Sequence, residues 1–133
     1  MSKRRILLID DEVFLCKLVK LNIEQTGRYE VATAHSGDEG LKRVEQEPFD
    51  LVITDFHMPG MNGEEVLARV KVLKPGCPVV LFSIFHDDKS VISRKTSVKA
   101  DAMISKPFDH AQLVQLIDEV LARPQPGAGG KGE

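Results

Sequence analysis

The sequence has 133 residues, of which 42% are hydrophobic and 29% are charged, and its formal net charge at pH 7 is -2. This size and composition are typical of one globular domain and exclude a disordered chain. The near balance of 18 basic and 20 acidic residues argues against direct nucleic-acid binding, which normally needs a basic surface. The two cysteines, Cys16 and Cys77, are far apart and do not indicate zinc or redox chemistry.

The N-terminal segment predicts neither a signal peptide nor a membrane span. Its basic residues precede an apolar run that stops at Ile9, and Asp10 and Asp11 follow at once. This run is too short for either role. We therefore expect a soluble, cytoplasmic protein that does not bind membranes.

Short apolar runs alternate with segments of helical periodicity in the first half of the chain. Residues 6–9 are apolar at every position, as in a strand buried on both faces. Apolar residues then recur at helical spacing until Gly27, which ends the first predicted helix. Residues 29–34 predict a second strand, and Ser36 is a suitable N-cap for a second helix. The buried face of that helix is predicted to consist of Gly37, Gly40, Leu41 and Val44.

Three further strands, each followed by a helix, complete the pattern. The strands are predicted at residues 51–53, 79–82 and 102–104. The apolar faces of the helices that follow span residues 66–70, 91–98 and 113–121, and the middle face is thin. Asp109 is a suitable N-cap for the last helix.

Five alternating strand–helix units predict an α/β fold in which helices cover both faces of a parallel sheet. Right-handed crossovers favour the flavodoxin-like, doubly wound topology with strand order 2-1-3-4-5 and five helices. We expect one domain over residues 1–123. Residues 124–133 are rich in Pro and Gly and predict a flexible tail or the stub of a linker.

Polar side chains are predicted to gather at the carboxyl ends of the strands, where sheets of this type bind ligands. They are Asp10, Asp11, Asp55, Ser83 and Lys106. Three carboxylates in one cleft repel one another unless a cation or a proton compensates, and Mg²⁺ suits such a set of oxygen ligands. Asp55 could then attack phosphorus as a nucleophile. Lys106 and the hydroxyl of Ser83 would bind the phosphoryl oxygens, as in other phosphoryl-transfer sites.

Four motifs in the sequence resemble those of the response regulator receiver family of two-component signalling. They are IDDE (9–12), DFHMPGMNG (55–63), FS (82–83) and SKPF (105–108), and the resemblance extends over residues 4–122. It implies that Asp55 accepts a phosphoryl group from a histidine kinase or a histidine phosphotransfer protein in a reaction that needs Mg²⁺. The signal would then change the face formed by helix four, strand five and helix five, for an unknown output partner or fused output domain.

The resemblance also implies a role for each residue of the site. Asp10 and Asp11 match the acidic pair that holds Mg²⁺, and Asp55 and the backbone carbonyl of His57 match the other protein ligands. Ser83 matches the switch hydroxyl, and Lys106 matches the lysine that binds the phosphoryl group. We expect a signalling domain rather than an enzyme, although such a domain assists its own phosphorylation and dephosphorylation.

Two of the departures from the usual pattern of the family concern access to the site and the switch. Ile84 follows Ser83 where a small residue is usual, so we expect Ile84 to restrict access to Asp55 and to slow phosphorylation by small donors. Met103 stands three residues before Lys106, where an aromatic residue usually turns between two positions. Methionine fills irregular gaps in several rotamers, which predicts a less sharp switch.

Other interpretations of these residues remain open from the sequence. Asp11 or Glu12 could cap the first helix instead of holding a metal. The chain could be a receiver-like protein-binding module that acts without phosphorylation. A phosphatase of the haloacid dehalogenase type also uses an aspartyl phosphate, but His57 stands where that family needs an acid. The four histidines, including His35, are scattered and do not predict a metal site.

Overall fold

A computed structural model describes residues 3–83, 100–105 and 109–123 of the chain. These residues form a five-stranded sheet with the order β2-β1-β3-β4-β5, in which all neighbouring strands are parallel. The strands are β1 (Arg4–Ile9), β2 (Tyr29–Ala34), β3 (Leu51–Asp55), β4 (Val79–Ser83) and β5 (Ala102–Ser105). The predicted flavodoxin-like strand order is therefore confirmed.

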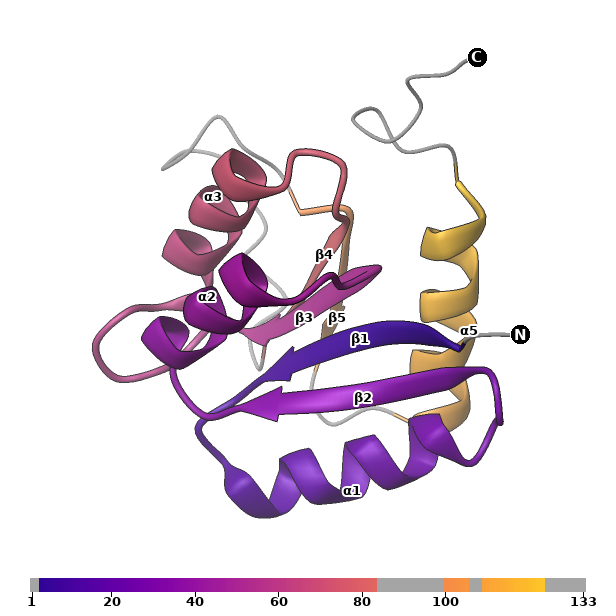
Figure 1. Cartoon of the computed structure of the whole chain (residues 1–133). Helices are drawn as coiled ribbons and strands as arrows, with labels where there is room; N and C mark the ends of the chain where they lie inside the picture. Colours follow the sequence, from indigo (N-terminus) through magenta and orange to yellow (C-terminus); the bar gives the residue numbers. More distant parts are fainter. Residues whose placement is uncertain (1–2, 84–99, 106–108, 124–133) are drawn as a thin grey trace.

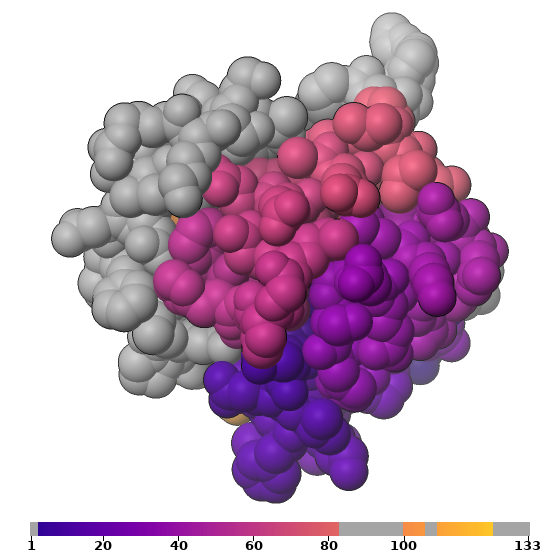
Figure 2. Space-filling model, turned by 90° about the vertical axis from the view of Figure 1, so that its left-hand side faces the viewer, coloured from indigo at the N-terminus to yellow at the C-terminus, as the bar shows by residue number. Residues whose placement is uncertain are grey.

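Four helices are described, and they cover both faces of the sheet. They are α1 (Val13–Glu24), α2 (Gly37–Gln46), α3 (Gly63–Leu73) and α5 (His110–Ala122). Figure 1 shows α2 and α3 on one face and α1 and α5 on the other, and Figure 2 shows the surfaces of α2 and α3 side by side. The predicted helix between β4 and β5 and the predicted tail lie outside the described residues. Within the described part of the chain, none of the helices is long and apolar enough to cross a membrane.

The core consists of two apolar clusters separated by the sheet. Successive side chains of a strand point to opposite faces, so Ile6 and Leu8 pack beneath α1 and α5, whereas Leu7 and Ile9 pack beneath α2 and α3. All four are fully buried, and each burial stabilises the fold by about 1.5–3 kcal/mol. The apolar run in β1 is continuous because helices cover both faces of the strand.

The strands differ in how far they are covered. β3 has hydrogen-bonded neighbours on both sides, and each of its five residues is buried. β5 forms an edge of the sheet, pairs only with β4, and has four residues that are all half-buried. The sheet therefore has a tightly packed centre and a more open edge.

The predicted N-caps of α2 and α5 are both confirmed. The side-chain oxygen of Ser36 accepts a hydrogen bond from the backbone N–H of Glu39 at 3.1 Å. Asp109 accepts one from the N–H of Ala111 at 2.9 Å and belongs to a complete capping box. Such caps typically contribute about 1 kcal/mol, and here they fix where each helix leaves the rim of the sheet.

The buried thiol of Cys77 makes stability depend on pH in the alkaline range. Burial raises the pKa of this thiol to about 11 from its ordinary value of 9.0. Because the pKa is higher in the folded state, the thiol's stabilising contribution is complete below pH 9 and is lost as the pH rises toward 11. We expect Cys77→Val to reduce the alkaline decline in unfolding free energy by about 2 kcal/mol. Urea unfolding between pH 9 and pH 11 measures this decline. A decline that is unchanged in Cys77→Val would show that the Cys77 thiol does not cause it.

Candidate functional site

The three aspartates predicted at the rim of the sheet lie together in the structure. Asp10 and Asp11 directly follow β1, and Asp55 is the last residue of β3. Because Ile9 pairs with Thr54 in the parallel register, the carboxyl ends of these two strands meet. One carboxylate oxygen from each aspartate lies within 4.8 Å of the other two. Asp10 and Asp55 are buried, with 0% and 4% of their surface exposed, whereas Asp11 is exposed.

The composition of this cluster fits a hard divalent cation. Three carboxylates at this separation, two of them withdrawn from water, repel one another unless positive charge or a proton compensates. All three side chains offer oxygen atoms, which Mg²⁺ prefers, and Mg²⁺ normally takes a few carboxylates together with waters or phosphate oxygens. Asp10, Asp11 and Asp55 could therefore hold Mg²⁺ at the rim formed by the carboxyl ends of β1 and β3.

Backbone contacts fix the position of Asp55. The N–H of Phe56 donates to the carbonyl of Phe82 on β4 at 2.8 Å, and the hydroxyl of Thr54 donates to the carbonyl of Asp55 at 3.1 Å. The N–H of Gly63, at the start of α3, donates to the carbonyl of Phe56 at 2.9 Å. A Cβ atom at Gly63 would lie only 2.4 Å from the carbonyl oxygen of Asp55. The start of α3 therefore packs directly on the backbone of Asp55 and Phe56.

The connection between β3 and α3 has an exposed side and an anchored side. The side chain of His57 is exposed, and its ring meets Phe56 edge-on, with centroids 4.7 Å apart. Met58 is buried in the cluster beneath α2 and α3, and Asn62 caps α3 by accepting from the N–H of Glu65 at 3.0 Å. The role predicted for the backbone carbonyl of His57 remains a prediction.

Contacts with described residues of α1 and β2 and of the segments next to them hold Asp10 at the end of β1. Its N–H donates to the carbonyl of Ala34 at 3.0 Å, and its carbonyl accepts from the thiol of Cys16 at 3.4 Å. The same carbonyl oxygen lies 3.1 Å from Nδ1 of His35. Oδ1 of Asp10 accepts from the N–H of Glu12 at 2.9 Å. Glu12 occupies the N-cap position of α1 without capping it through its own side chain, so the interpretation of Glu12 as a side-chain cap is wrong.

The remaining predicted residues of the site are described only in part. Ser83 ends β4 and pairs with Ser105 at the end of β5. The side chain of Ser83, and all of Ile84 and Lys106, lie outside the described residues, so their roles remain predictions. Met103 on β5 is half-buried and packs against the cluster beneath α2 and α3.

The structure also contains a buried carboxylate that the sequence analysis missed. Glu64, in the first turn of α3, has 8% of its surface exposed. Among the described residues, Oε2 of Glu64 has no hydrogen-bond partner. The spacing did contain a signal, because Glu64 precedes the buried Leu67 by three residues and therefore lies on the same face of the helix.

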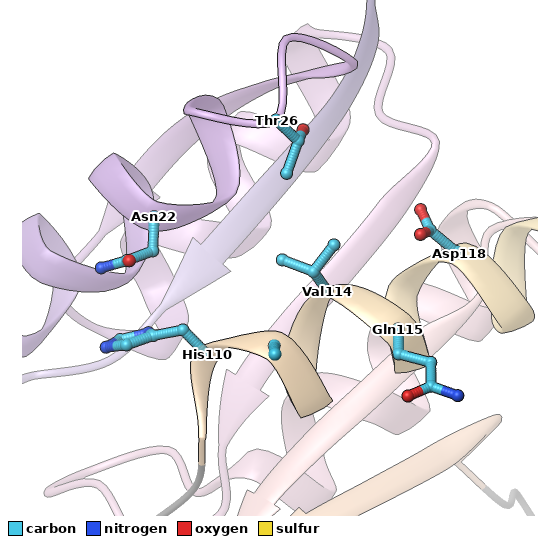
Figure 3. Close-up of a pocket in the computed structure, with 7 residues that line it drawn as sticks. Asn22, Thr26, His110, Val114, Gln115 and Asp118 are labelled. Atoms are coloured by element: carbon cyan, nitrogen blue, oxygen red, sulfur yellow. The ribbon is translucent and has the colours of Figure 1, made fainter.

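A groove whose lining residues are mostly of polar types lies between α1 and α5. Figure 3 shows the side chains of Asn22 on α1 and His110 on α5 pointing in the same direction in this view. The residues that line this groove are Asn22, Thr26, His110, Ala111, Val114, Gln115 and Asp118. None of the three clustered aspartates is among them, so the groove and the aspartate cluster are separate features of the described surface.

Comparison with known proteins agrees with this geometry. The family model of the response regulator receiver domain matches residues 6–118. The transcriptional regulatory protein GlrR of Escherichia coli K12 is 35% identical over 121 residues, which are 91% of this chain and 27% of GlrR. The chain thus spans about a quarter of the length of that relative.

Solved structures show the same fold. A CheY-like response regulator receiver domain protein from Methanospirillum hungatei has a TM-score of 0.82 and 35% identity, over 90% of this chain and 94% of that chain. The response regulator TrrA from Thermotoga maritima, solved in complex with Mg²⁺ and BeF, has a TM-score of 0.78 and 31% identity, over 88% and 98% of the two chains. Together with the family match, these comparisons show that the chain belongs to the response regulator receiver domain family of two-component systems.

Proposed function

We propose that the chain accepts a phosphoryl group on Asp55 in a reaction that depends on Mg²⁺. The observation that supports this most is the aspartate cluster, in which buried Asp55 stands within 4.8 Å of the acidic pair that follows β1. A carboxylate oxygen of Asp55 would form a bond to phosphorus while the bond from phosphorus to the donor breaks. The proposed donor is a phosphorylated histidine of a kinase or phosphotransfer protein, whose imidazole nitrogen leaves and takes up a proton.

The other residues of the site bind and orient the reacting groups in this proposal. Asp10, Asp11, Asp55 and the carbonyl of His57 would hold Mg²⁺, which when bound neutralises charge on the phosphoryl oxygens. Lys106 would bind a phosphoryl oxygen through its ammonium group.

Signal output is also part of the proposal. Ser83 would donate its hydroxyl to the phosphoryl group, Met103 would adjust its packing, and Ile84 would limit access of small donors. The longer relative GlrR is a transcriptional regulatory protein, so we propose that a fused domain or a separate partner in the cytoplasm responds to the change.

A direct labelling experiment tests the proposed chemistry. The protein is incubated with Mg²⁺ and acetyl phosphate, and intact mass is measured before and after treatment with acid or base. An acyl phosphate should be stable in acid and labile in base. A folded protein that forms no such adduct, with either acetyl phosphate or a phosphorylated histidine donor, would favour the alternative of a binding module that acts without phosphorylation.

Asp11→Ala is expected to weaken Mg²⁺ binding and to stabilise the metal-free fold. Asp11 is exposed, so its truncation leaves no cavity, and it removes repulsion from the two buried carboxylates. We expect a gain of up to about 1 kcal/mol in metal-free unfolding free energy and a loss of Mg²⁺ affinity of about tenfold or more. Urea unfolding in EDTA and a Mg²⁺ titration measure the two effects. Glu45→Ala on α2 is the control, and unchanged affinity in Asp11→Ala would place the metal elsewhere.

A further inference from the structure

His35 stands beside Asp10 at the rim of the sheet. β1 and β2 are parallel neighbours, and their last residues, Ile9 and Ala34, are paired in the register. His35 and Asp10 are therefore each the first residue beyond its strand. The N–H of Asp10 continues the ladder by donating to the carbonyl of Ala34 at 3.0 Å. In this arrangement Nδ1 of His35 lies 3.1 Å from the carbonyl oxygen of Asp10.

The backbone of His35 is itself held by the start of α2. Its N–H donates to Oε1 of Glu39 at 2.9 Å, while the N–H of Glu39 donates to the side chain of Ser36 at 3.1 Å. This pair of hydrogen bonds resembles a capping box, in which the glutamate would accept from the N–H of the N-cap residue, Ser36. Here Glu39 accepts instead from the N–H of His35, the residue before the N-cap. The imidazole therefore extends from a backbone segment that is anchored to both the sheet and a helix.

The direction of the contact follows from the chemistry of its two partners. A carbonyl oxygen can only accept, so the hydrogen bond requires a proton on Nδ1 of His35. This carbonyl belongs to the planar peptide unit whose N–H is that of Asp11. A group that fixes the oxygen therefore orients the main chain of Asp10 and of Asp11 together.

We propose that His35 is a positioning residue for the Mg²⁺ site and acts through the peptide that joins Asp10 to Asp11. Carboxylate oxygens within 4.8 Å of one another tend to separate in the absence of a cation. The hydrogen bond from His35 holds this peptide in place, so less ordering is needed when the ion binds. This inference rests on the proposed function of Asp10 and Asp11 as metal ligands.

Substitution of His35 by asparagine or glutamine distinguishes the effect of the Nδ1 hydrogen-bond donor from the effect of side-chain size. Asparagine places a side-chain N–H where Nδ1 lies, whereas glutamine places one near the position of Nε2. His35→Asn should therefore bind Mg²⁺ within about twofold of the unmodified protein, and His35→Gln and His35→Ala should bind about threefold to tenfold more weakly. Backbone amide shifts of residues 10–12 during a Mg²⁺ titration measure the affinity without reference to phosphorylation.

Labelling kinetics distinguish positioning from a general structural effect. In His35→Ala, the Mg²⁺ concentration that gives half-maximal labelling by acetyl phosphate should rise by the same factor as the dissociation constant. The maximal rate at saturating Mg²⁺ should stay within about twofold, because the acceptor itself is unchanged. No Mg²⁺ binding by the unmodified protein would overturn the proposed function together with this inference. Unchanged affinity in His35→Ala, equal losses in the asparagine and glutamine variants, or a matching loss of maximal rate would overturn the positioning role alone.

Discussion

Asp55→Asn is expected to abolish phosphoryl incorporation while the fold is retained. The amide has nearly the same shape as the carboxylate but lacks the charged oxygen that attacks phosphorus. It also removes one of three mutually repelling charges from a site where Asp55 is 4% exposed, so stability should not fall. Intact mass after incubation with Mg²⁺ and acetyl phosphate should show labelling reduced by at least about a hundredfold.

Asp50→Asn is the matched control for this experiment. Asp50 immediately precedes β3, so the same substitution is made at the opposite end of the same strand. Its side chain is exposed and accepts a hydrogen bond from the N–H of Arg5 at 2.8 Å, which an asparagine oxygen can also accept. Labelling of this variant should equal that of the unmodified protein. If Asp55→Asn still formed the full adduct, the acceptor would have to be another residue.

A single methyl group at Gly63 is expected to destabilise the fold by about 3 kcal/mol and to slow labelling of Asp55. The added Cβ atom would lie 2.4 Å from the carbonyl oxygen of Asp55 and 2.7 Å from Cα of Phe56. Both are backbone atoms, so no change of side-chain rotamer relieves the clash. The start of α3 must move away, which also strains the hydrogen bond from Gly63 to the carbonyl of Phe56. Urea unfolding and the labelling rate measure the two consequences.

Gly27→Ala adds the same methyl group where no heavy atom lies within 4 Å. Gly27 has a φ of 81°, so the alanine variant is destabilised only by its left-handed backbone, by about 1 kcal/mol. Labelling of Asp55 should be unaffected, because Gly27 lies in the turn that follows α1. Equal destabilisation in the two variants would show that close packing of α3 on Asp55 does not set the cost at Gly63.

The sequence predicted the sheet and the aspartate cluster because both depend on local patterns. A strand segment covered on both faces is apolar at every position, as residues 6–9 of β1 are, and the carboxyl ends of neighbouring parallel strands lie at the same rim of the sheet. Ser36 and Asp109 were predictable as caps for the same reason, since each acts on a backbone N–H two or three residues away. Short-range rules thus sufficed to predict where Asp10 and Asp55 meet.

Contacts that depend on the register between strands could not be predicted in this way. His35 reaches Asp10 only because Ile9 pairs with Ala34, and a shift of one residue would place the imidazole elsewhere. Cys16, in the first turn of α1, reaches the same carbonyl across the short connection between β1 and α1, and no spacing in the sequence specifies the course of that connection. The roles of Lys106 and Ile84 still depend on the resemblance to the family.

The central place of β3 in the sheet limits how the molecule can respond to a new charge on Asp55. A strand with neighbours on both sides and five buried residues is stiff, so Asp55 cannot shift far without breaking two ladders of hydrogen bonds. The edge strand β5, half-buried and paired on one side only, is more compliant. Strain introduced at β3 is therefore relieved with the smallest cost in free energy by movement of β5. In the proposed function, the atom that is phosphorylated and the surface that responds would therefore lie in different parts of the same sheet.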